Sequence, residues 1–300
     1  MEEFKSGFVA VVGKTNVGKS TIINRLVGEK VSAVVNKVQT TRKNIRAIVN
    51  TDNAQIIFID TPGFYKSKTK LSKEMNETAF YSIKDADSVL YVIDAKDSGI
   101  DEKAIEQIKN ANKKTILIIN KIDLVSPKKV ADIINEYKDL YDFSAIIPVS
   151  VRKNENVDVI LDEIIKTLKP GAAYYDVDEY TDQTMRELAE ETIREKAMKL
   201  LQEEVPHGIY VEVTKMKFRK TKNKENIYDV DATIYCLKNS HKGIIIGKGG
   251  QMLKRIGTYA REDMEKMFQT KVNLTLLVKV REDWINNEQI VKNIVGTKKK

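Results

Sequence analysis

Apolar runs alternate with amphipathic stretches along residues 1–170 of the chain. The runs FVAVV, SVLYVID and TILIIN show no alternation of apolar and polar positions, which is typical of strands buried on both faces. Helical patterns separate these runs, so the first half of the chain is predicted to form βα units around a mostly parallel sheet. The helices are expected at 18–27, 101–111, 127–140 and 156–168.

The runs IRAIV and QIIFID are the exception to this alternation. Only residues 50–54 lie between them, whereas a crossover to a parallel strand needs about a dozen residues or more. We therefore expect these two strands to form an antiparallel hairpin at one edge of the sheet.

The pattern changes at Pro170 and Gly171, where an acidic and aromatic stretch begins that fits neither a helix nor a strand. This change predicts a first domain over 1–170, a linker over 171–183 and a second domain over 184–300. The second domain is expected to end in a C-terminal helix and a basic tail.

Apolar positions in the second domain predict an α-β-β-α-α-β order of elements. The expected elements are a helix at 184–204, strands at 209–219 and 227–237, a short helix up to 246, a helix at 250–268 and a strand at 271–280. The chain is thus predicted to contain an α/β domain followed by a smaller α+β domain.

The composition is that of a globular protein, because 42% of the 300 residues are hydrophobic and 31% are charged. The sequence has no apolar span of roughly 20 residues and no signal-peptide pattern at its start, so we expect a cytoplasmic protein. Cys236 is the only cysteine, which excludes an internal disulfide and favours a reducing compartment. His207 and His241 lack the cysteine partners of a zinc site.

Positive charge is concentrated in the second domain. The net charge of the whole chain is +8. Residues 211–281 contain 16 basic and 7 acidic side chains, a net charge of +9, and the chain ends in three further lysines. This distribution favours an acidic partner for the second domain.

The stretch GKTNVGKS, residues 13–20, follows a predicted strand and opens a predicted helix, which is the context of a phosphate-binding P-loop. Its glycines allow backbone N–H groups to surround the phosphates, and the helix start adds a positive dipole end. We expect Lys19 to reach the β- and γ-phosphates and Ser20 to hold Mg²⁺. A bare P-loop pattern can also arise by coincidence or serve another nucleotide.

Two later motifs favour a guanine nucleotide. Asp60 in DTPG closes the run QIIFID, where its carboxylate can hold Mg²⁺ through water, and the Gly63 N–H can sense the γ-phosphate. NKID, residues 120–123, follows TILIIN, and its Asp123 can accept hydrogen bonds from the guanine N1–H and amino group. Adenine offers neither donor, so a carboxylate at this position discriminates strongly against it.

The order and spacing of these motifs resemble those of the Ras-like, translation-factor-related GTPases. The resemblance implies a P-loop GTPase domain with a six-stranded sheet and guanine nucleotide at the C-terminal ends of the strands. It also places the first switch in QTTRKN, residues 39–44, with Thr41 as the Mg²⁺ and γ-phosphate ligand and Thr40 as the alternative. Ser150 and Val151 are expected to support the base, although serine followed by alanine is more usual there.

The expected nucleotide site can be summarised by role. The catalytic residues are Lys19, Thr41 and Gly63, and the Mg²⁺ ligands are Ser20, Thr41 and Asp60. The residues expected to contact GTP or GDP are Gly13, Lys14, Thr15, Asn16, Val17, Gly18, Lys19, Ser20, Thr21, Asp60, Thr61, Pro62, Gly63, Asn120, Lys121, Asp123, Ser150 and Val151.

Phe64 stands after DTPG, where Ras-type enzymes carry a glutamine that orients the attacking water. Slow intrinsic GTP hydrolysis is therefore expected, with the water placed by backbone groups, by a partner or by a cation. A side-chain oxygen of Asn16 within the P-loop could ligate K⁺. Packing of Phe64 beneath the second switch is an equally good explanation of that residue.

A second glycine-rich stretch, HKGIIIGKGGQMLKRIG, runs from His241 to Gly257. It follows a short helix instead of a buried strand, and no Mg²⁺ carboxylate or base reader accompanies it, which speaks against a second nucleotide site. Glycines between two helices allow close approach of a sugar-phosphate chain, which favours a clamp for single-stranded RNA. A helix-ending glycine followed by solvated lysines is the simpler alternative.

This stretch and the α-β-β-α-α-β order resemble a KH domain of the bacterial type, type II, over about residues 184–280. The expected RNA-binding residues are Lys242, Ile246, Gly247, Lys248, Gly249, Gly250, Lys254 and Arg255. The lysines and the arginine would contact phosphates without reading sequence.

A GTPase domain followed by such a KH domain resembles the Era family over nearly the whole chain. The family resemblance implies binding to the 3′ end of 16S rRNA, a role in 30S ribosomal subunit assembly, and peripheral contact with the cytoplasmic face of the cell membrane. We expect a monomer. The alternative functions are a signalling or scaffold GTPase whose second domain binds protein, and a GTPase that acts in nucleic-acid modification.

Overall fold

The computed structural model describes residues 3–35, 41–63 and 69–296. By its internal contacts the chain divides into two compact units. The first consists mainly of Met1–Ser32 and Thr41–Asp182, and the second mainly of Gln183–Ile294. No helix in the described ranges combines the length and the apolarity needed to cross a membrane.

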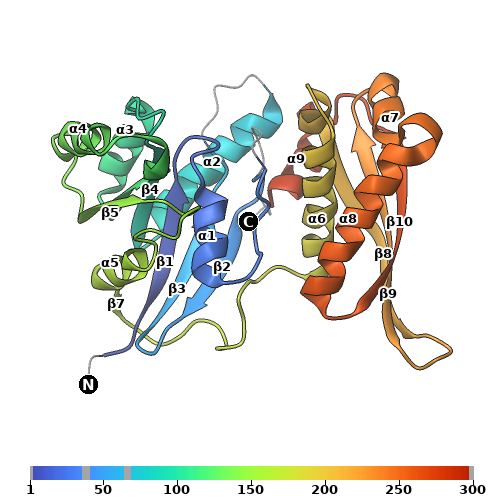
Figure 1. Cartoon of the computed structure of the whole chain (residues 1–300), viewed down its shortest axis with the longest axis horizontal. Helices are drawn as coiled ribbons and strands as arrows, with labels where there is room; N and C mark the ends of the chain where they lie inside the picture. Colours follow the sequence, from blue (N-terminus) through green and yellow to red (C-terminus); the bar gives the residue numbers. More distant parts are fainter. Residues whose placement is uncertain (1–2, 36–40, 64–68, 297–300) are drawn as a thin grey trace. The chain divides into compact units, whose positions relative to one another are not determined.

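A mostly parallel sheet forms the centre of the first unit (Figure 1). Its strands run in the order β2-β3-β1-β4-β5-β6, and a two-residue β7 pairs antiparallel with the start of β1. The strands are β1 (Lys5–Val12), β2 (Ile45–Asn50), β3 (Ala54–Asp60), β4 (Ser88–Asp94), β5 (Lys114–Asn120), β6 (Ala145–Val149) and β7 (Lys169–Pro170). The predicted hairpin at the edge is confirmed, because β2 pairs only with β3 among the described strands and runs antiparallel to it.

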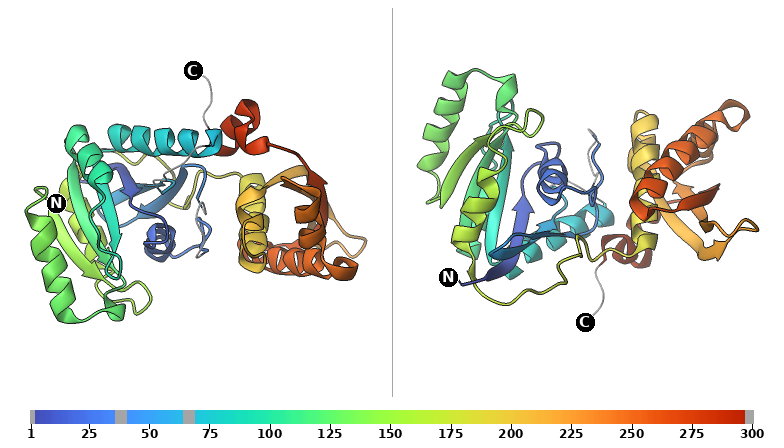
Figure 2. Two further views of the ribbon diagram at one scale, coloured as in Figure 1. Left: turned by 90° about the horizontal axis from the view of Figure 1, so that it is seen from above. Right: turned by 60° about the horizontal axis from the view of Figure 1, so that its bottom comes forward.

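Helices cover both faces of this sheet (Figure 2). The helices are α1 (Lys19–Val27), α2 (Lys70–Asp85), α3 (Glu102–Ala111), α4 (Pro127–Lys138) and α5 (Val159–Thr167). Successive residues of β1 point to opposite faces, so Val9 packs in the core beneath α1 and α5, and Ala10 packs in the core beneath α2, α3 and α4. Burial on both faces explains why these strands read as continuous apolar runs.

The hydrophobic pattern does not predict α2, and the reason lies in its inward face. Leu71 and Met75 are buried there together with the polar side chains of Ser72, Thr78 and Ser82, so the apolar stripe is broken. The Ser82 hydroxyl donates to the backbone O of Thr78 within the helix and accepts from Asn44 Nδ2 at 2.7 Å, so its hydrogen bonds are satisfied although it is buried. A helix start signal was present, because the Thr69 side chain caps the first turn.

The second unit has the predicted α-β-β-α-α-β order, followed by a C-terminal helix. Its elements are α6 (Met185–Leu200), β8 (Ile209–Lys220), β9 (Asn226–Cys236), α7 (Asn239–Ile246), α8 (Gln251–Phe268), β10 (Lys271–Val280) and α9 (Glu288–Val295). The central strand β9 is antiparallel to β8 and parallel to β10.

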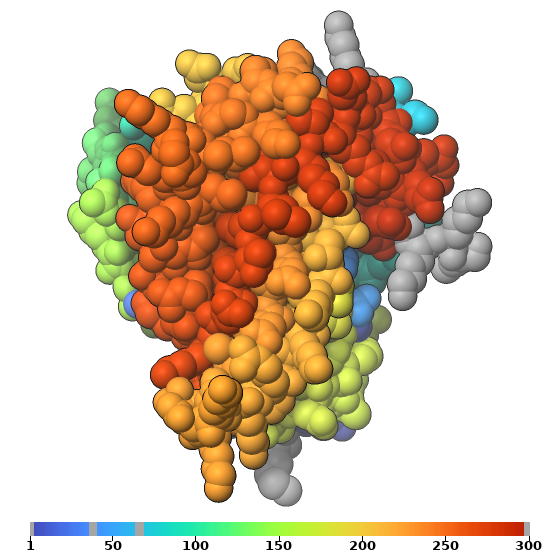
Figure 3. All heavy atoms as spheres, turned by 90° about the vertical axis from the view of Figure 1, so that its right-hand side faces the viewer, coloured from blue at the N-terminus to red at the C-terminus, as the bar shows by residue number. Residues whose placement is uncertain are grey.

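One face of this three-stranded sheet packs against α6 and α8. Ile193 and Ala197 of α6 share a core with Ile256 and Met264 of α8 and with Ile234 of β9. The hairpin between β8 and β9 extends beyond that core (Figures 1 and 3). Helix α6 ends at Leu200, before the expected end at 204, because Leu201 already has extended backbone angles and a short 3₁₀ turn begins at Val205.

The segment expected to be a linker is hydrogen-bonded to the edge hairpin of the first unit. The Gln55 side-chain oxygen accepts from the backbone N–H groups of Tyr174 and Tyr175 at 2.7 and 3.0 Å. Further along, the Ile48 N–H donates to the Tyr180 backbone O at 3.0 Å, and the Arg46 guanidinium lies 3.3 Å from the Asp182 carboxylate. The segment is therefore bound to β2 and β3 along most of its length.

Candidate functional site

The turn from β1 into α1 is built around glycines that no other residue can replace. Gly13 has a φ of 145°, and a Cβ there would lie 2.1 Å from the backbone O of Val92. Gly18 has a φ of 104°, and a Cβ there would lie 2.3 Å from the side-chain nitrogen of Asn120. The left-handed backbone and the close neighbours both require glycine, as a loop that turns its N–H groups inward should.

Lys19 begins α1, and its ammonium is folded back onto this loop. Its Nζ donates to the backbone O atoms of Gly13 and Lys14 at 3.0 Å each, and the residue is only 7% exposed. Burial lowers the pKa of Lys19 to about 8, and the nearby Asp60 opposes that shift. Because burial disfavours its charged form, this ammonium would be stabilised by the negative charge of a bound phosphate group.

Three oxygen-bearing side chains converge beside Lys19. The Ser20 hydroxyl donates to Asp60 Oδ2 at 2.7 Å and lies 3.2 Å from the Thr41 hydroxyl, which in turn is 3.4 Å from the same carboxylate oxygen. Burial raises the pKa of Asp60, and Lys19 opposes that shift. Asp60 Oδ1 is buried without a hydrogen-bond partner among the described residues.

These three residues fit a magnesium ion. Mg²⁺ takes oxygen ligands, and a protein commonly supplies one or two of them beside the phosphates of a substrate. The unpaired carboxylate oxygen of Asp60 also provides the kind of buried polar atom that a ligand is expected to satisfy. The structure thus brings together the three residues expected to hold the ion, Ser20, Thr41 and Asp60.

The DTPG turn lies against the P-loop. A Cβ on Gly63 would be 2.7 Å from Thr15 Cγ2 and 3.1 Å from the Thr15 backbone N, so any other residue would require Thr15 to shift. The Thr61 hydroxyl donates to the backbone O of Val11 at 2.7 Å, and Pro62 is buried. This places the Gly63 backbone where a terminal phosphate bound by Lys19 would be within reach. Thr40 and Phe64, for which roles are predicted above, lie outside the described residues.

The NKID stretch follows β5 and is joined to the two neighbouring loops. Asn120 Nδ2 donates to the backbone O of Val17 at 2.8 Å, while its Oδ1 accepts from the Lys121 N–H at 2.8 Å and from the Val151 N–H at 3.5 Å. The Ser150 hydroxyl donates to Asp123 Oδ1 at 2.7 Å. Asn120 thus holds the loops together, and Ser150 orients the carboxylate that is expected to read guanine.

Lys121 has a partner, Asp94, that its motif does not predict. Its Nζ donates to the backbone O of Asn16 at 2.7 Å and to the Asp94 carboxylate at 2.6 Å. Both bonds fix the lysine stem, which is expected to lie over the purine. Asp94 closes the run SVLYVID just as Asp60 closes QIIFID, so a carboxylate at the end of a buried strand was the available signal.

The other predicted P-loop residues have separate surroundings. Lys14 donates to the backbone O of Gly99 at 3.0 Å and lies 3.9 Å from the Asp97 carboxylate. Val17 is buried in the core beneath α1, and Thr21 is half-buried in the first turn of that helix. Asn16 is exposed, and within the described ranges its side chain makes no hydrogen bond.

The glycine turn of the second unit is accessible. Lys248 and Gly249 are exposed between α7 and α8, and the φ angles of Gly247, Gly249 and Gly250 are 73°, 58° and 78°. A Cβ on Gly247 would lie 2.7 Å from the Cβ of Met252, so this glycine also allows the close approach of α8. The turn can therefore contact a polymer through its backbone.

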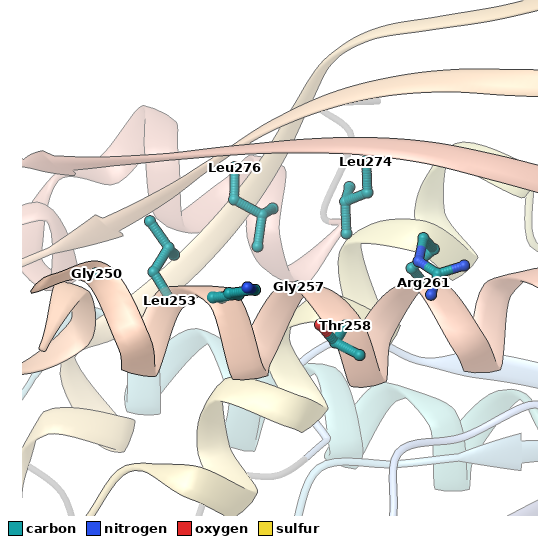
Figure 4. Close-up of a pocket in the computed structure, with 8 residues that line it drawn as sticks. Gly250, Leu253, Gly257, Thr258, Arg261, Leu274 and Leu276 are labelled. Atoms are coloured by element: carbon teal, nitrogen blue, oxygen red, sulfur yellow. The ribbon is translucent and has the colours of Figure 1, made fainter.

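A cavity of about 390 Å³ begins at this turn and continues between α8 and β10 (Figure 4). Its lining residues are Gly250, Leu253, Lys254, Gly257, Thr258, Arg261, Leu274 and Leu276. Two predicted RNA-binding residues, Gly250 and Lys254, belong to this wall. Lys242 and Ile246 are half-buried on α7 and Arg255 is exposed on α8, and none of these three lines the cavity.

Comparisons with known proteins match both units. Residues 8–121 match the family of 50S ribosome-binding GTPases, and residues 204–285 match the KH domain family. The chain is 46% identical to GTPase Era of Clostridium novyi over 97% of its own length and 98% of that protein, and 44% identical to GTPase Era of Clostridium kluyveri over 97% and 98%.

Two solved structures are also similar. The crystal structure of Era in complex with MgGDPNP and nucleotides 1506–1542 of 16S ribosomal RNA has a TM-score of 0.92 and 40% identity, covering 96% of this chain and 98% of that one. A variant of Aquifex aeolicus Era bound to GDP and AlF₄⁻ has a TM-score of 0.92 and 39% identity, with the same coverage of 96% and 98%.

Proposed function

We propose, since the chain belongs to the Era family of GTPases, that it is a GTP-dependent switch that binds single-stranded RNA and acts in assembly of the 30S ribosomal subunit. The RNA is the 3′ end of 16S rRNA, which contains the nucleotides bound in the similar Era complex. The observation that carries the RNA proposal is the glycine turn Gly247–Gly250, in which Lys248 and Gly249 are exposed and Gly250 lines one end of the cavity between α8 and β10.

As a member of this family the protein is a GTPase that uses Mg²⁺, and its residues can be assigned to parts of the reaction. Lys19, whose ammonium donates to the Gly13 backbone O of the P-loop, would bind the β- and γ-phosphates. Ser20, Thr41 and Asp60 would hold Mg²⁺, which when bound neutralises phosphate charge. The Gly63 N–H would bind the γ-phosphate, so Thr41 and Gly63 would lose a contact once that group is gone.

Chemistry in the second unit supports RNA as the partner. The turn offers backbone and the Lys248 side chain to a phosphate, while Leu253, Leu274 and Leu276 give the cavity apolar walls that suit the faces of bases. A protein segment could also occupy an apolar cavity, as in a scaffold GTPase. The net charge of +9 over residues 211–281 favours the polyanion.

A binding experiment with one variant tests this proposal. A fluorescent RNA with the sequence of nucleotides 1506–1542 of 16S rRNA is titrated with the wild-type protein and with Gly249→Asp. The aspartate places a negative charge beside the phosphates and a side chain at a φ of 58°, so we expect RNA affinity to fall by at least about 10-fold with GTP affinity unchanged. Equal RNA affinity in both proteins would contradict the clamp and favour a protein partner.

The switch itself predicts that RNA affinity depends on the bound nucleotide. We propose that the form with a GTP analogue binds the same RNA more tightly than the GDP form, because only a γ-phosphate can hold Thr41 and Gly63 together. Equal affinity in the two forms would show that the two units are not coupled.

We also propose that intrinsic hydrolysis is slow and that K⁺ assists it. The support is the exposed Asn16 side chain, whose oxygen is available within the P-loop. Replacement of K⁺ by Na⁺ at constant ionic strength should lower the turnover number, and Asn16→Ala should remove the difference between the two ions. Equal turnover in both salts would exclude this role.

A cytoplasmic location, peripheral contact with the cytoplasmic face of the cell membrane and a monomeric state complete the proposal. Their support is the family resemblance and the expectations stated for the sequence. Fractionation of cells with an antibody to the protein tests the location, and sedimentation of the purified protein tests the monomer.

A further inference from the structure

Gly257 lies in the middle of α8, at a position where neither the backbone nor the packing requires glycine. Its φ does not fall in the left-handed region, unlike those of Gly247, Gly249 and Gly250. A glycine inside a helix weakens it relative to alanine. The fold alone therefore gives no reason for this residue.

Alanine would fit at this position. Apart from the backbone of α8 itself and the two chain neighbours, the only heavy atom of the described residues within 4 Å of a Cβ built on Gly257 is Leu276 Cδ1 at 3.4 Å, which is ordinary van der Waals contact. The missing methyl group is thus not forced by a close neighbour, in contrast to Gly247, whose Cβ would lie 2.7 Å from Met252.

The methyl group would point into the cavity instead. Gly257 lines it from α8, opposite the side chains of Leu274 and Leu276, which reach from β10 toward the helix in Figure 4. Leu253 lies one turn before Gly257 on the same wall. Absence of a side chain at 257 leaves a flat apolar surface between these leucines, and a base can lie against such a surface.

The far end of this surface has a fixed cation. Nη1 of Arg261 donates to both carboxylate oxygens of Glu265 at 3.0 and 2.9 Å, and Glu265 Oε1 also accepts from the Val272 N–H at 3.1 Å. Within the described ranges the remaining guanidinium N–H groups of Arg261 make no hydrogen bond, so they are available to a bound nucleotide.

We propose that Gly257 determines access to this part of the cavity: its missing side chain admits one base of the RNA against Leu274 and Leu276. The inference rests on the proposed RNA-binding function. It predicts opposite effects of Gly257→Ala on two properties. The alanine stabilises the second unit, because it strengthens α8, and it weakens RNA binding, because its methyl group takes the place of the base.

The experiment uses the full-length protein bound to a GTP analogue and the fluorescent RNA of nucleotides 1506–1542. We expect Gly257→Ala to lower RNA affinity by about 10-fold, within the range of one base contact. We expect its melting midpoint, followed by fluorescence of the buried Trp284, to rise by a few degrees. An unchanged RNA affinity in a protein with a raised midpoint would overturn the inference.

Gly243→Ala is the matched control. Gly243 lies in α7 and does not line the cavity, and a Cβ there would meet no heavy atom of the described residues within 4 Å beyond its chain neighbours and the backbone of its own helix. This variant should be stabilised as well and should bind RNA as the wild type does. An equal loss of affinity in both variants would show that stiffening of the helices, not filling of the cavity, lowers binding.

A set of RNAs with a single abasic nucleotide identifies the base concerned. At one position the wild-type protein should lose about 10-fold in affinity, and Gly257→Ala should bind that RNA as weakly as the wild type does. Purely additive losses at every position would contradict the proposal. If the wild-type protein does not bind the intact RNA, the proposed function itself fails, which this series distinguishes from failure of the role of Gly257.

Discussion

At the scale of single residues, burial determines the chemistry of the nucleotide site. Lys19 and Asp60 are both enclosed, and burial lowers the pKa of Lys19 and raises the pKa of Asp60, so it favours the neutral form of each. The charge of the other residue opposes each shift. The ammonium is left with two backbone carbonyls as hydrogen-bond partners. A polyphosphate would add further negative charge beside the ammonium and stabilise its protonated form.

We predict that GDP affinity falls as pH rises above about 8. Burial lowers the pKa of Lys19 to about 8 in the free protein, and bound phosphates would raise it again. Below that pH the free protein already carries the ammonium, whereas above it binding must also take up a proton, so affinity falls by up to tenfold per pH unit. Titration with a fluorescent GDP analogue between pH 7 and 9.5 measures this.

Lys19→Arg is the control for that titration. A guanidinium stays charged throughout this range, so the decline attributed to Lys19 should disappear, while ionisation of the guanine ring affects both proteins alike. The same slope in the variant and in the wild type would assign the decline to another group.

Asp123→Asn should change which base is bound. The variant keeps an oxygen for the Ser150 hydroxyl, which donates at 2.7 Å, but it turns an amide toward the guanine N–H donors. We expect GDP affinity to fall by about 10⁴-fold, and xanthosine diphosphate, which has a carbonyl in place of the amino group, to bind better than GDP. Competition with both nucleotides measures this, and retained preference for GDP would refute the assignment of Asp123.

At the scale of elements, the strands were predictable because their burial leaves a direct mark on the sequence. Residues of β1, β4 and β5 are apolar at successive positions, as two covered faces require. Helix α2 left a weaker mark, since Ser72, Thr78 and Ser82 occupy its buried face. The end of α6 was misplaced because the polar residues after Leu200 fit a helix as well as a turn.

The residues of the candidate sites likewise differ in how far they could be predicted from the sequence. Residues within one motif could be predicted, because the P-loop and NKID each place their groups along a continuous stretch. Asp94 and Arg261 reach their sites through contacts that only the fold creates, with Lys121 in one case and across the cavity from Leu274 in the other. No local sequence pattern predicts contacts between residues that are this far apart in the chain.

The start of α6 provides a test at this scale. Thr184 and Glu187 form a capping box, in which the Thr184 side chain accepts from the Glu187 N–H and Glu187 accepts from the Thr184 N–H. Thr184→Ala should lower the free energy of unfolding of the second unit by about 1 kcal/mol. Urea denaturation followed through Trp284, the only tryptophan, measures this unit. Thr184→Ser keeps the cap, so it should lose less than the alanine variant does.

At the scale of the whole molecule, the two units differ in how their charged side chains are arranged. Residues 211–281 carry a net charge of +9 although the complete chain carries only +8. A surface of this kind binds a polyanion with release of counterions, which makes affinity depend on salt. The nucleotide site instead encloses its charges, and enclosed charges are screened much less.

We predict that RNA affinity falls steeply with KCl concentration and that one lysine accounts for a defined part of the slope. Lys248→Ala should reduce the slope of log affinity against log salt by about 0.7, the contribution of one phosphate in a single strand. Lys222, exposed at the tip of the β8–β9 hairpin, is the control, and Lys222→Ala should leave the slope unchanged. A larger change for Lys222 than for Lys248 would move the RNA to the hairpin.

Residues 174–182 are attached to β2 and β3, so only residue 183 lies between this attachment and Thr184, the capping residue of α6. Strand β2 begins four residues after Thr41, which is proposed to bind the γ-phosphate, and the same strand contacts Tyr180 and Asp182 in the segment that leads to the second unit. A shift of β2 would therefore also displace the segment that joins the two units. Insertion of a few flexible residues between Asp182 and Thr184 should therefore leave GTP hydrolysis and RNA binding intact. It should remove the difference in RNA affinity between the form bound to a GTP analogue and the form bound to GDP.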